Sequence, residues 1–321
     1  MINLMKYDVL SVGRITLDVF LFIDSTNQHF RLNQQTKELC IKLGDKAIVD
    51  RAEFLMGGNA ANVSVAFSRL GLKAAVMAEI GSDGFSERII DELKKEKVDT
   101  SFVKAMSGIS SSFSMILNFN GERTIFEEVA KVKNDFSLEN IDTKWIYLTS
   151  VCNNWEKVYD RVLEYAEKKA VKIAFNPGTK QLDAGLEKIL KVLHKTEILF
   201  LNKEEAARLV NLPIDEEERI ISLLKSKGVK NVVITEGLRG SFVEDESGNK
   251  QRFGVVKSNA VERTGAGDSY AAAFLAARIY GHSFLDAIKW GTYNAASVVS
   301  EIGSQPGLLT KKEMEKKINN E

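Results

Sequence analysis

A short glycine-rich segment, Thr264-Gly265-Ala266-Gly267-Asp268, runs directly into a helix-forming stretch at residues 271–278. A loop that opens a helix leaves the first backbone N–H groups unpaired at the positive end of the helix dipole, where anions such as phosphate bind. Asp268 adds a carboxylate, which a simple phosphate site does not need. A phosphoryl-transfer site does need one, because a base must accept the proton of the attacking hydroxyl. The segment indicates phosphoryl transfer, and a tight turn with a capping aspartate is its structural alternative.

Two other phosphate-binding motifs are missing from the chain. No G-x-x-x-x-G-K-[S/T] segment is present, which argues against a P-loop enzyme. Gly265-x-Gly267 is followed by Tyr270 at the position where a dinucleotide-binding fingerprint has its third glycine. A Rossmann oxidoreductase is therefore poorly supported.

The glycine-rich segment follows a regular alternation of strands and helices. Such an alternation predicts an α/β fold with a mostly parallel sheet and right-handed crossovers. The predicted strands are 7–13, 73–80, 145–149, 171–175, 198–201 and 231–235. The predicted helices are 60–70, around 87–96, 155–169, 183–194, 203–210, 216–227, 269–280 and 284–301, with an antiparallel pair at 242–244 and 251–257.

Two polar excursions interrupt this alternation. Residues 25–50 contain short alternating stretches, which suggest a small β appendage. Residues 112–119 and 123–126, joined by Asn120-Gly121, predict a hairpin. The two excursions could pair into one small sheet.

The composition is that of an ordinary globular protein. The 321 residues carry 44 Lys and Arg against 44 Asp and Glu, so no global charge favours nucleic acid or a membrane surface as partner. No apolar run approaches the ~20 residues that span a bilayer, and the N-terminus lacks a signal-peptide layout, so we expect a cytoplasmic protein. Two cysteines and three scattered histidines leave oxygen atoms as the expected metal ligands.

The residues that follow the predicted strands form a characteristic set. Polar and glycine residues fall at successive strand ends, where ligands bind in open α/β sheets. They are Gly13…Asp18, Gly57-Gly58-Asn59 with Asn62, Gly81-x-Asp83-Gly84, Asn202-x-x-Glu205, Thr235-x-Gly237 and Gly265-Ala266-Gly267-Asp268. In this order, and over essentially the whole chain, they resemble the ribokinase-like (PfkB-type) carbohydrate kinase family.

The resemblance implies a fold and an activity. The fold is a single three-layer α/β/α domain over residues 1–321, with a mostly parallel central sheet and a small β-sheet lid from about 17–55 and 105–130. The activity is ATP-dependent phosphorylation of a hydroxyl on a small sugar, with Mg²⁺ as cofactor. The longer segment at 25–50 suits a lid that contributes to substrate recognition or to a homodimer contact.

The resemblance also implies roles for individual residues. Asp268 matches the catalytic base, and Gly265, Ala266 and Gly267 match an anion hole for the transferred phosphoryl group. Asn202 and Glu205 match the element that positions magnesium, largely through waters. Asp18, Gly57, Gly58, Asn59 and Asn62 match substrate-binding positions, and Asn202, Thr235, Gly237, Gly240, Thr264 and Asn294 match the nucleotide side. The role of Asn176 near the phosphate path is less specific.

Some alternatives stay open at this stage. Relatives usually carry Asp-Thr where this chain has Glu262-Arg263, so potassium (K⁺) activation is an open question, and Arg263 either faces the phosphates or points to solvent. A nucleoside kinase is the alternative function, for which Phe20, Phe22, Phe113 and Phe126 could form a slot for the base. A catalytically silent sugar- or nucleotide-binding regulator is a further alternative, which an intact Asp268 and its loop disfavour.

Overall fold

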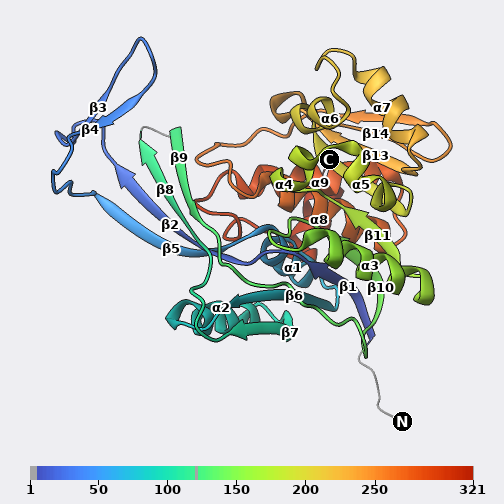
Figure 1. Ribbon diagram of the computed structural model, residues 1–321. Coiled ribbons are helices and arrows are strands. Elements are labelled where there is room, and N and C mark those ends of the chain that lie inside the picture. Colours follow the sequence, from blue (N-terminus) through green and yellow to red (C-terminus); the bar gives the residue numbers. More distant parts are fainter. Residues whose placement is uncertain (1–5, 120–121, 321) are drawn as a thin grey trace.

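The computed structural model describes residues 6–119 and 122–320, and its centre is one nine-stranded sheet (Figure 1). All neighbouring strands pair in parallel except β13–β14 and β14–β15, which are antiparallel. The expected mostly parallel α/β sheet is therefore confirmed. In spatial order the strands are β15 (Lys250–Phe253), β14 (Ser241–Glu244), β13 (Asn231–Thr235), β12 (Thr196–Asn202), β11 (Lys172–Phe175), β10 (Asp142–Leu148), β1 (Lys6–Val12), β6 (Ala74–Gly81) and β7 (Asp99–Met106).

Helices cover both faces of this sheet. Successive strand residues point to opposite faces, so Val9 packs into one hydrophobic cluster and Leu10 into the other. The first cluster contains α1 (Asn59–Arg69), α2 (Gly84–Lys95), α8 (Ala266–Ile279), α9 (Phe284–Val298) and α10 (Lys311–Asn319). The second contains α3 (Trp155–Lys169), α4 (Thr179–Ala184), α5 (Leu186–Leu193), α6 (Lys203–Val210) and α7 (Glu217–Ser226). A single 3₁₀ turn, η1 (Gly237–Arg239), follows β13.

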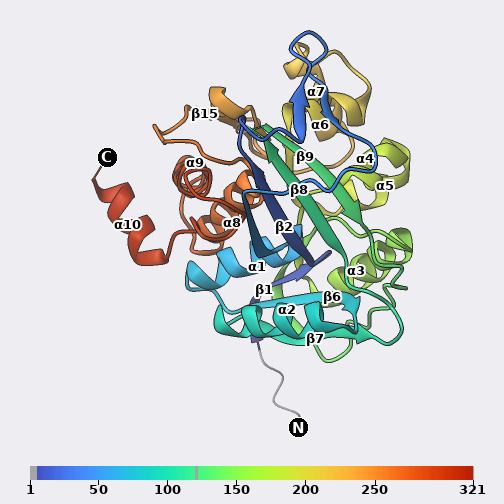
Figure 2. The same cartoon turned by 90° about the vertical axis from the view of Figure 1, so that its left-hand side faces the viewer.

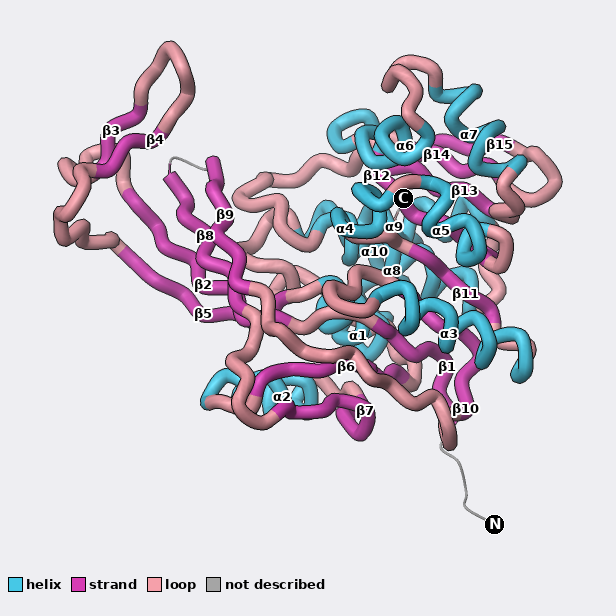
Figure 3. The backbone as a smooth tube through the Cα atoms, viewed as in Figure 1, coloured by secondary structure: helices cyan, strands magenta, loops and turns pink. Residues whose placement is uncertain are grey.

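A second, smaller sheet projects from the main body, and we call it the lid. Its strands, in spatial order, are β5 (Arg51–Gly57), β2 (Thr16–Ile23), β8 (Phe113–Phe119) and β9 (Glu122–Glu128). Figure 3 shows it apart from the main sheet, and in Figure 2 it crosses in front of the body. Residues between β2 and β5 form a two-stranded ribbon, β3 (Phe30–Leu32) and β4 (Leu39–Ile41), which packs apolar side chains against the tip of the lid.

The strand register separates an inner and an outer lid face. Arg123 and Glu127 of β9 form ion pairs with residues of the main body, so their face is the inner one. The cross-strand register places three rows on that face: Asp18, Ser114 and Glu127; Phe20, Ile116 and Ile125; and Phe22, Asn118 and Arg123. The outer face carries Phe54, Val19, Met115 and Phe126 in one row.

Several boundaries differ from the sequence-based expectation. The helix predicted at 183–194 is two helices, because Gly185 adopts a φ of 85° between them. The edge strand β7 was not predicted, since its mixed polar pattern lacks a continuous apolar run. Because β7 extends to Met106 in the main sheet, the second lid segment, expected from about residue 105, starts after residue 106. The antiparallel partner predicted at 251–257 ends at Phe253.

The N-terminus of α8 is also earlier than expected. The helix begins at Ala266, so Asp268 is inside its first turn. The turn predicted at Asn120-Gly121 lies outside the described residues. Among the helices that the structure describes, none is long and apolar enough to cross a membrane.

Candidate active site

Asp268 lies where α8 meets α1, at the centre of the predicted site. It is 7% exposed, and each carboxylate oxygen accepts one hydrogen bond of 2.9 Å, from Nδ2 of Asn59 and from Nδ2 of Asn62. Burial raises the pKa of Asp268, and the two amide donors counteract part of that effect. Each oxygen keeps a lone pair for a further donor. The carboxyl group is therefore placed and tuned to accept a proton.

Both amide atoms of Asn62 have protein partners. Its Nδ2 donates to Asp268, and its Oδ1 accepts from Oγ of Ser304 at 2.7 Å and from Nε2 of Gln305 at 3.0 Å. The side chain is 5% exposed. These contacts allow Asn62 to orient Asp268, and the expected grip of Asn62 on a substrate hydroxyl stays a prediction. Asn59, at the start of α1, is partly exposed and can face a substrate.

The loop before Asp268 presents free backbone donors. The N–H groups of Gly265, Gly267 and Asp268 donate no hydrogen bond to any described residue, whereas the N–H of Ala266 donates to the carbonyl of Arg263 over 3.3 Å. Gly265 has a φ of 76°, and a Cβ there would lie 2.4 Å from Cβ of Ser304. Only glycine fits this turn. The loop can thus hold an anion through Gly265 and Gly267, with Asp268 N–H as a donor that the sequence did not suggest and with Ala266 less available.

Asp18 lies on the inner face of the lid, at the base of β2. The side chain is 6% exposed, and Oδ1 accepts a hydrogen bond of 3.0 Å from Oγ1 of Thr16. Burial raises the pKa of Asp18 to about 6, with Thr16 and Ser114 opposing the rise by hydrogen bonding. A Cβ on Gly57 would lie 2.0 Å from Oδ2 of Asp18, so glycine leaves room for this carboxylate. Gly58, with a φ of 89°, follows as the N-cap of α1.

Asn202 and Glu205 form a capping box at the start of α6. Oδ1 of Asn202 accepts from the N–H of Glu205 at 2.7 Å, and Oε2 of Glu205 accepts from the N–H of Asn202 at 2.9 Å. The pKa of Glu205 is raised by burial and by the nearby charges of Asp268 and Glu204. The neighbouring carboxylates of Glu205 and Asp268 repel each other and would suit a divalent cation. The contact between Asn202 and Glu205 also has a purely structural explanation, the helix cap. Glu204 is exposed. Among the described residues, no cluster of three or more His, Cys, Asp or Glu side chains could hold a metal ion.

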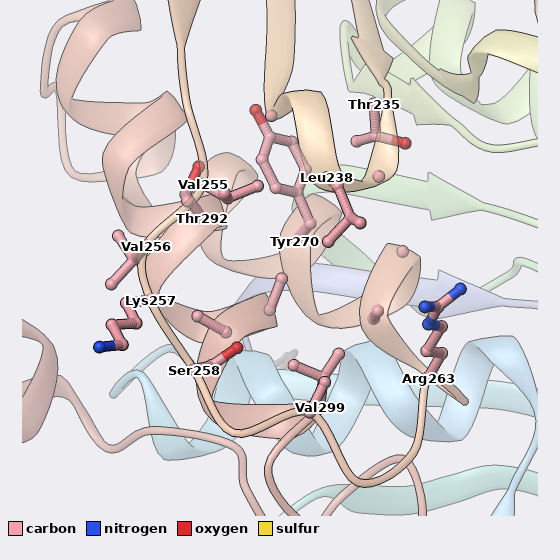
Figure 4. Close-up of a pocket in the computed structure, with 17 residues that line it drawn as sticks. Thr235, Leu238, Val255, Val256, Lys257, Ser258, Arg263, Tyr270, Thr292 and Val299 are labelled. Carbon is pink, nitrogen blue, oxygen red and sulfur yellow. The ribbon is translucent and has the colours of Figure 1, made fainter. Parts of the chain in front are cut away.

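A pocket of about 410 Å³ borders the glycine-rich loop that precedes Asp268, which we call the anion-binding loop (Figure 4). Predicted residues Thr235, Gly237 and Gly240 line it, and so do Ala266 and Gly267. The remaining wall is largely apolar, which suits a flat heterocyclic ring next to a phosphate site. Arg263 also lines the pocket and is exposed to solvent, so both of its expected orientations stay open. The other wall residues include Leu238, Val255, Tyr270, Thr292, Ala296 and Val299.

Four predicted polar residues lie outside this pocket wall: Asn202, whose contacts are given above, Asn294, Thr264 and Asn176. Asn294 is 0% exposed, donates from Nδ2 to the carbonyl of Ser269 and accepts from the N–H of Leu309, so it cannot contact a nucleotide. Its helix, α9, does line the pocket. Thr264 hydrogen-bonds to the carboxylate of Glu262. Asn176 donates to the carbonyl of Phe200 at 2.9 Å and ties β11 to β12.

The four phenylalanines proposed as a base slot do not face one another. Phe20 and Phe22 stack on the inner lid face, with ring centroids 6.3 Å apart, and Phe20 is fully buried. Phe113 and Phe126 lie on the outer face, because they align with Leu17 and with Met115 in the register. A single slot formed by all four is therefore excluded.

The sequence analysis missed the groups that support the site. The carboxylate of Glu236, next to the pocket loop, binds Nζ of Lys203 at 2.9 Å and the guanidinium of Arg252 at 2.5 Å. Arg123, Ser304 and Gln305 were also missed. Each partner is distant in sequence, with Asn62 and Ser304 separated by 242 positions, so no local pattern could pair them.

Comparison with known proteins shows which family and fold this chain has. The model of the pfkB family carbohydrate kinases matches residues 20–311. A ribokinase from Haemophilus influenzae is 26% identical over 288 residues, covering 85% of this chain and 90% of the relative. A 5-dehydro-2-deoxygluconokinase from Bacillus subtilis is 25% identical over 283 residues, covering 82% of this chain and 86% of the relative.

Solved structures share the fold. Arabidopsis thaliana ribokinase in complex with ribose and ATP superposes with a TM-score of 0.81 at 19% identity, covering 97% of this chain and 98% of that one. A Methanocaldococcus jannaschii nucleoside kinase superposes with a TM-score of 0.79 at 22% identity, covering 98% and 99%. The expected ribokinase-like α/β fold with its small sheet is therefore confirmed. The chain belongs to the pfkB family of carbohydrate kinases, which transfer a phosphoryl group to an alcohol acceptor.

Proposed function

We propose that this protein transfers the γ-phosphoryl group of ATP to a hydroxyl of a small sugar, with Asp268 as the general base. The carrying observation is the position of Asp268: a buried carboxylate with a raised pKa lies beside free N–H groups at the start of α8. Next to those groups is a pocket large enough for part of a nucleotide. Ribose and ATP are bound in the Arabidopsis thaliana ribokinase structure, which supports this pair of ligands.

The chemistry follows from three groups of this chain. Asp268 accepts the proton of the sugar hydroxyl as the hydroxyl oxygen attacks phosphorus. The N–H groups of Gly265, Gly267 and Asp268 stabilise the charge that develops on the transferred phosphoryl group. Asn59 and Asn62 hold the carboxylate of Asp268 in place during the transfer.

The acceptor lies between Asp268 and the inner face of the lid in this proposal. Asp18 accepts hydrogen bonds from adjacent sugar hydroxyls, and Asn59 donates or accepts one more. Both residues lie next to the backbone of Gly57 and Gly58, which have no side chains to exclude a ligand. Closure of the lid keeps water from competing as the acceptor.

Magnesium is the expected partner of the nucleotide. A complex of Escherichia coli putative ribokinase II with ATP and Mg²⁺ shares this fold, with a TM-score of 0.80. Glu205 and Asn202 would hold the hydrated ion at the start of α6, consistent with the raised pKa of Glu205. When bound, the ion neutralises charge on the phosphates.

The test of the base is the variant Asp268→Asn. We expect its turnover to fall by at least about a thousandfold, while the affinity for ATP stays within a few-fold, because the backbone donors and the pocket are unchanged. The acceptor panel should contain pentoses, hexoses, sugar phosphates, sugar acids and nucleosides, with ADP release as readout. The matched control is Asp286→Asn, which changes a first-turn aspartate of the adjacent helix α9. Turnover of Asp268→Asn within tenfold of the parent would refute the assignment.

The same panel decides between a sugar and a nucleoside as acceptor. Phe22, which is partly exposed on the inner lid face and stacks on the buried Phe20, forms with the exposed Ile125 the apolar surface that a base could contact. Preferred turnover of nucleosides would identify the chain as a nucleoside kinase. Preferred turnover of free pentoses or hexoses would support the sugar kinase.

We also propose that the outer lid face forms a homodimer contact. Phe54, Met115 and Phe126 are 44%, 37% and 56% exposed and lie in one cross-strand row. A contiguous exposed apolar row is typical of a protein interface. Phe126→Asp should convert a dimer to a monomer in light scattering, whereas a parent protein that is already monomeric at high concentration would refute the contact.

A further inference from the structure

Glu262 is a buried carboxylate that organises the anion-binding loop. Its side chain is 3% exposed. Oε2 accepts from the backbone N–H of Thr264 at 2.8 Å, and Oε1 accepts from the hydroxyl of Thr264 at 2.7 Å. Thr264 immediately precedes Gly265, so Glu262 fixes the start of the loop. A negative charge at this place also repels the phosphates that the loop is proposed to bind.

The cation that neutralises Glu262 comes from the lid. Nη1 of Arg123 lies 2.6 Å from Oε1 of Glu262, and it also contacts the hydroxyl of Thr264. Arg123 lies near the start of β9, 139 residues away in sequence. Among the described residues, no other cation forms an ion pair with Glu262. A buried carboxylate is unfavourable unless it is paired, so the charge balance of the loop depends on the position of the lid.

A second ion pair holds the other end of the same strand. Glu127 of β9 pairs with Nη2 of Arg14, at the end of β1, over 2.6 Å. Arg123 and Glu127 are four residues apart and point to the same face of the strand. The two pairs have opposite polarity, with the lid supplying the cation in one and the anion in the other. Strand β9 is thus bound to the main body at both ends, in one register.

We propose that Arg123 is a positioning residue for phosphoryl transfer, which links lid closure to the anion-binding loop by neutralising Glu262. With the lid closed, the guanidinium removes the repulsion between Glu262 and the phosphates and holds Thr264 in place. With the lid displaced, the carboxylate is left without its cation. Because Arg123 already balances the charge of Glu262, and Oε1 accepts both the guanidinium and the hydroxyl of Thr264, the residues present do not fit a monovalent cation. Turnover is therefore independent of potassium. The inference rests on the proposed function of the loop.

The test is a double-mutant cycle on Arg123 and Glu262. Arg123→Met removes the charge and keeps much of the side-chain length, and we expect kcat to fall by about ten- to a hundredfold, less than for a direct anion-hole donor because Arg123 is half-exposed. Glu262→Gln in the Arg123→Met background should restore at least half of the lost activity on a logarithmic scale, since it removes the unpaired charge. Arg123→Lys should keep most of the turnover. The matched control is Arg51→Met, which removes a lid arginine that pairs with Glu53 within the same strand.

Three outcomes of the turnover measurements would overturn the inference. Equal turnover of Arg123→Met and the parent would show that the ion pair does not act on the loop. A fall in turnover that Glu262→Gln does not relieve would show that Arg123 acts elsewhere, for example on the substrate. A parent enzyme that loses turnover when potassium is replaced by tetramethylammonium would refute the internal-cation role.

A binding measurement separates this inference from the proposed function. Adenylyl imidodiphosphate with magnesium should bind the Arg123→Met variant about tenfold more weakly than the parent, and the double variant should regain that affinity. Calorimetry gives this result whether or not any acceptor is turned over. If no acceptor of the panel is turned over but the Arg123→Met variant binds the nucleotide analogue more weakly than the parent and the double variant, the proposed function alone is contradicted. If the parent and the Arg123→Met variant bind the analogue equally well, the inference is contradicted.

Discussion

The contact between Asn62 and Asp268 makes a quantitative prediction about pH dependence. Asn62→Leu keeps the approximate volume of the side chain and removes the 2.9 Å hydrogen bond to Oδ2 of Asp268. A hydrogen bond to a charged group contributes about 1.5–3 kcal/mol, and one pH unit corresponds to about 1.4 kcal/mol. Because that bond favours the ionised form, its loss raises the pKa of Asp268 further. The acidic limb of kcat should therefore move upward by about one to two pH units.

The sign of this effect follows from the role of Asp268 as base. Only the carboxylate accepts a proton, so turnover is lost as the pH falls through the pKa of Asp268 in the complex. The measurement is kcat between pH 5 and 9, at saturating sugar and ATP, so that weaker binding does not enter. At high pH the variant should recover most of the parent turnover.

The control for this prediction is Ser304→Ala. Ser304 donates to the carbonyl of Asn62, so this variant disturbs the same network and leaves both hydrogen bonds of Asp268 in place. Its stability should fall, and its acidic limb should stay at the parent position. A folded Asn62→Leu variant whose acidic limb coincides with that of the parent would refute the reasoning.

The remaining predictions concern the substrate and the nucleotide loop. In the proposed site Asp18 binds hydroxyls as a carboxylate, and burial raises its pKa to about 6. We therefore expect KM for the acceptor to rise by about tenfold per pH unit as the pH falls below 6. The Asp18→Asn variant should lack this pH dependence. Gly57→Ala places a Cβ 2.0 Å from Oδ2 of Asp18, so we expect KM for the acceptor to rise by at least about tenfold and the free energy of unfolding to fall by about 1–3 kcal/mol. An unchanged KM would contradict the assignment of Asp18. Glu236→Gln weakens the contacts to Lys203 and Arg252 beside the pocket, so KM for ATP should rise several-fold while kcat changes little, and the opposite pattern would contradict a nucleotide-side role.

Much of this architecture could be predicted from the sequence because its signals are local. The alternation of apolar runs with helical periodicity identified the parallel sheet, since strands buried on both faces must be continuously apolar. Glycine and aspartate at strand ends marked the site, because the carboxyl ends of parallel strands meet at one edge. The loop at 264–268 could be recognised as an anion site from its glycines and the helix that follows. The polar edge strand β7 and the break at Gly185 carried no comparable signal.

The roles of the individual side chains were decided by tertiary contacts. The sequence predicts ligand contacts for Asn62 and Asn294, and the structure shows that both side chains are buried and hydrogen-bonded to other segments of the chain. The lid face of each phenylalanine depended on strand register, which no single strand specifies. Arg123 and Glu262 are 139 residues apart, so no local sequence pattern connects them. Folding of the lid onto the main body brings Nη1 of Arg123 to 2.6 Å from Oε1 of Glu262. The sequence by itself determined the fold, and it predicted the chemistry that we propose for the loop, since both depend on short-range patterns. Tertiary structure decided which groups orient the base and balance the charge, because hydrogen bonds and ion pairs between distant segments exist only after the chain has folded.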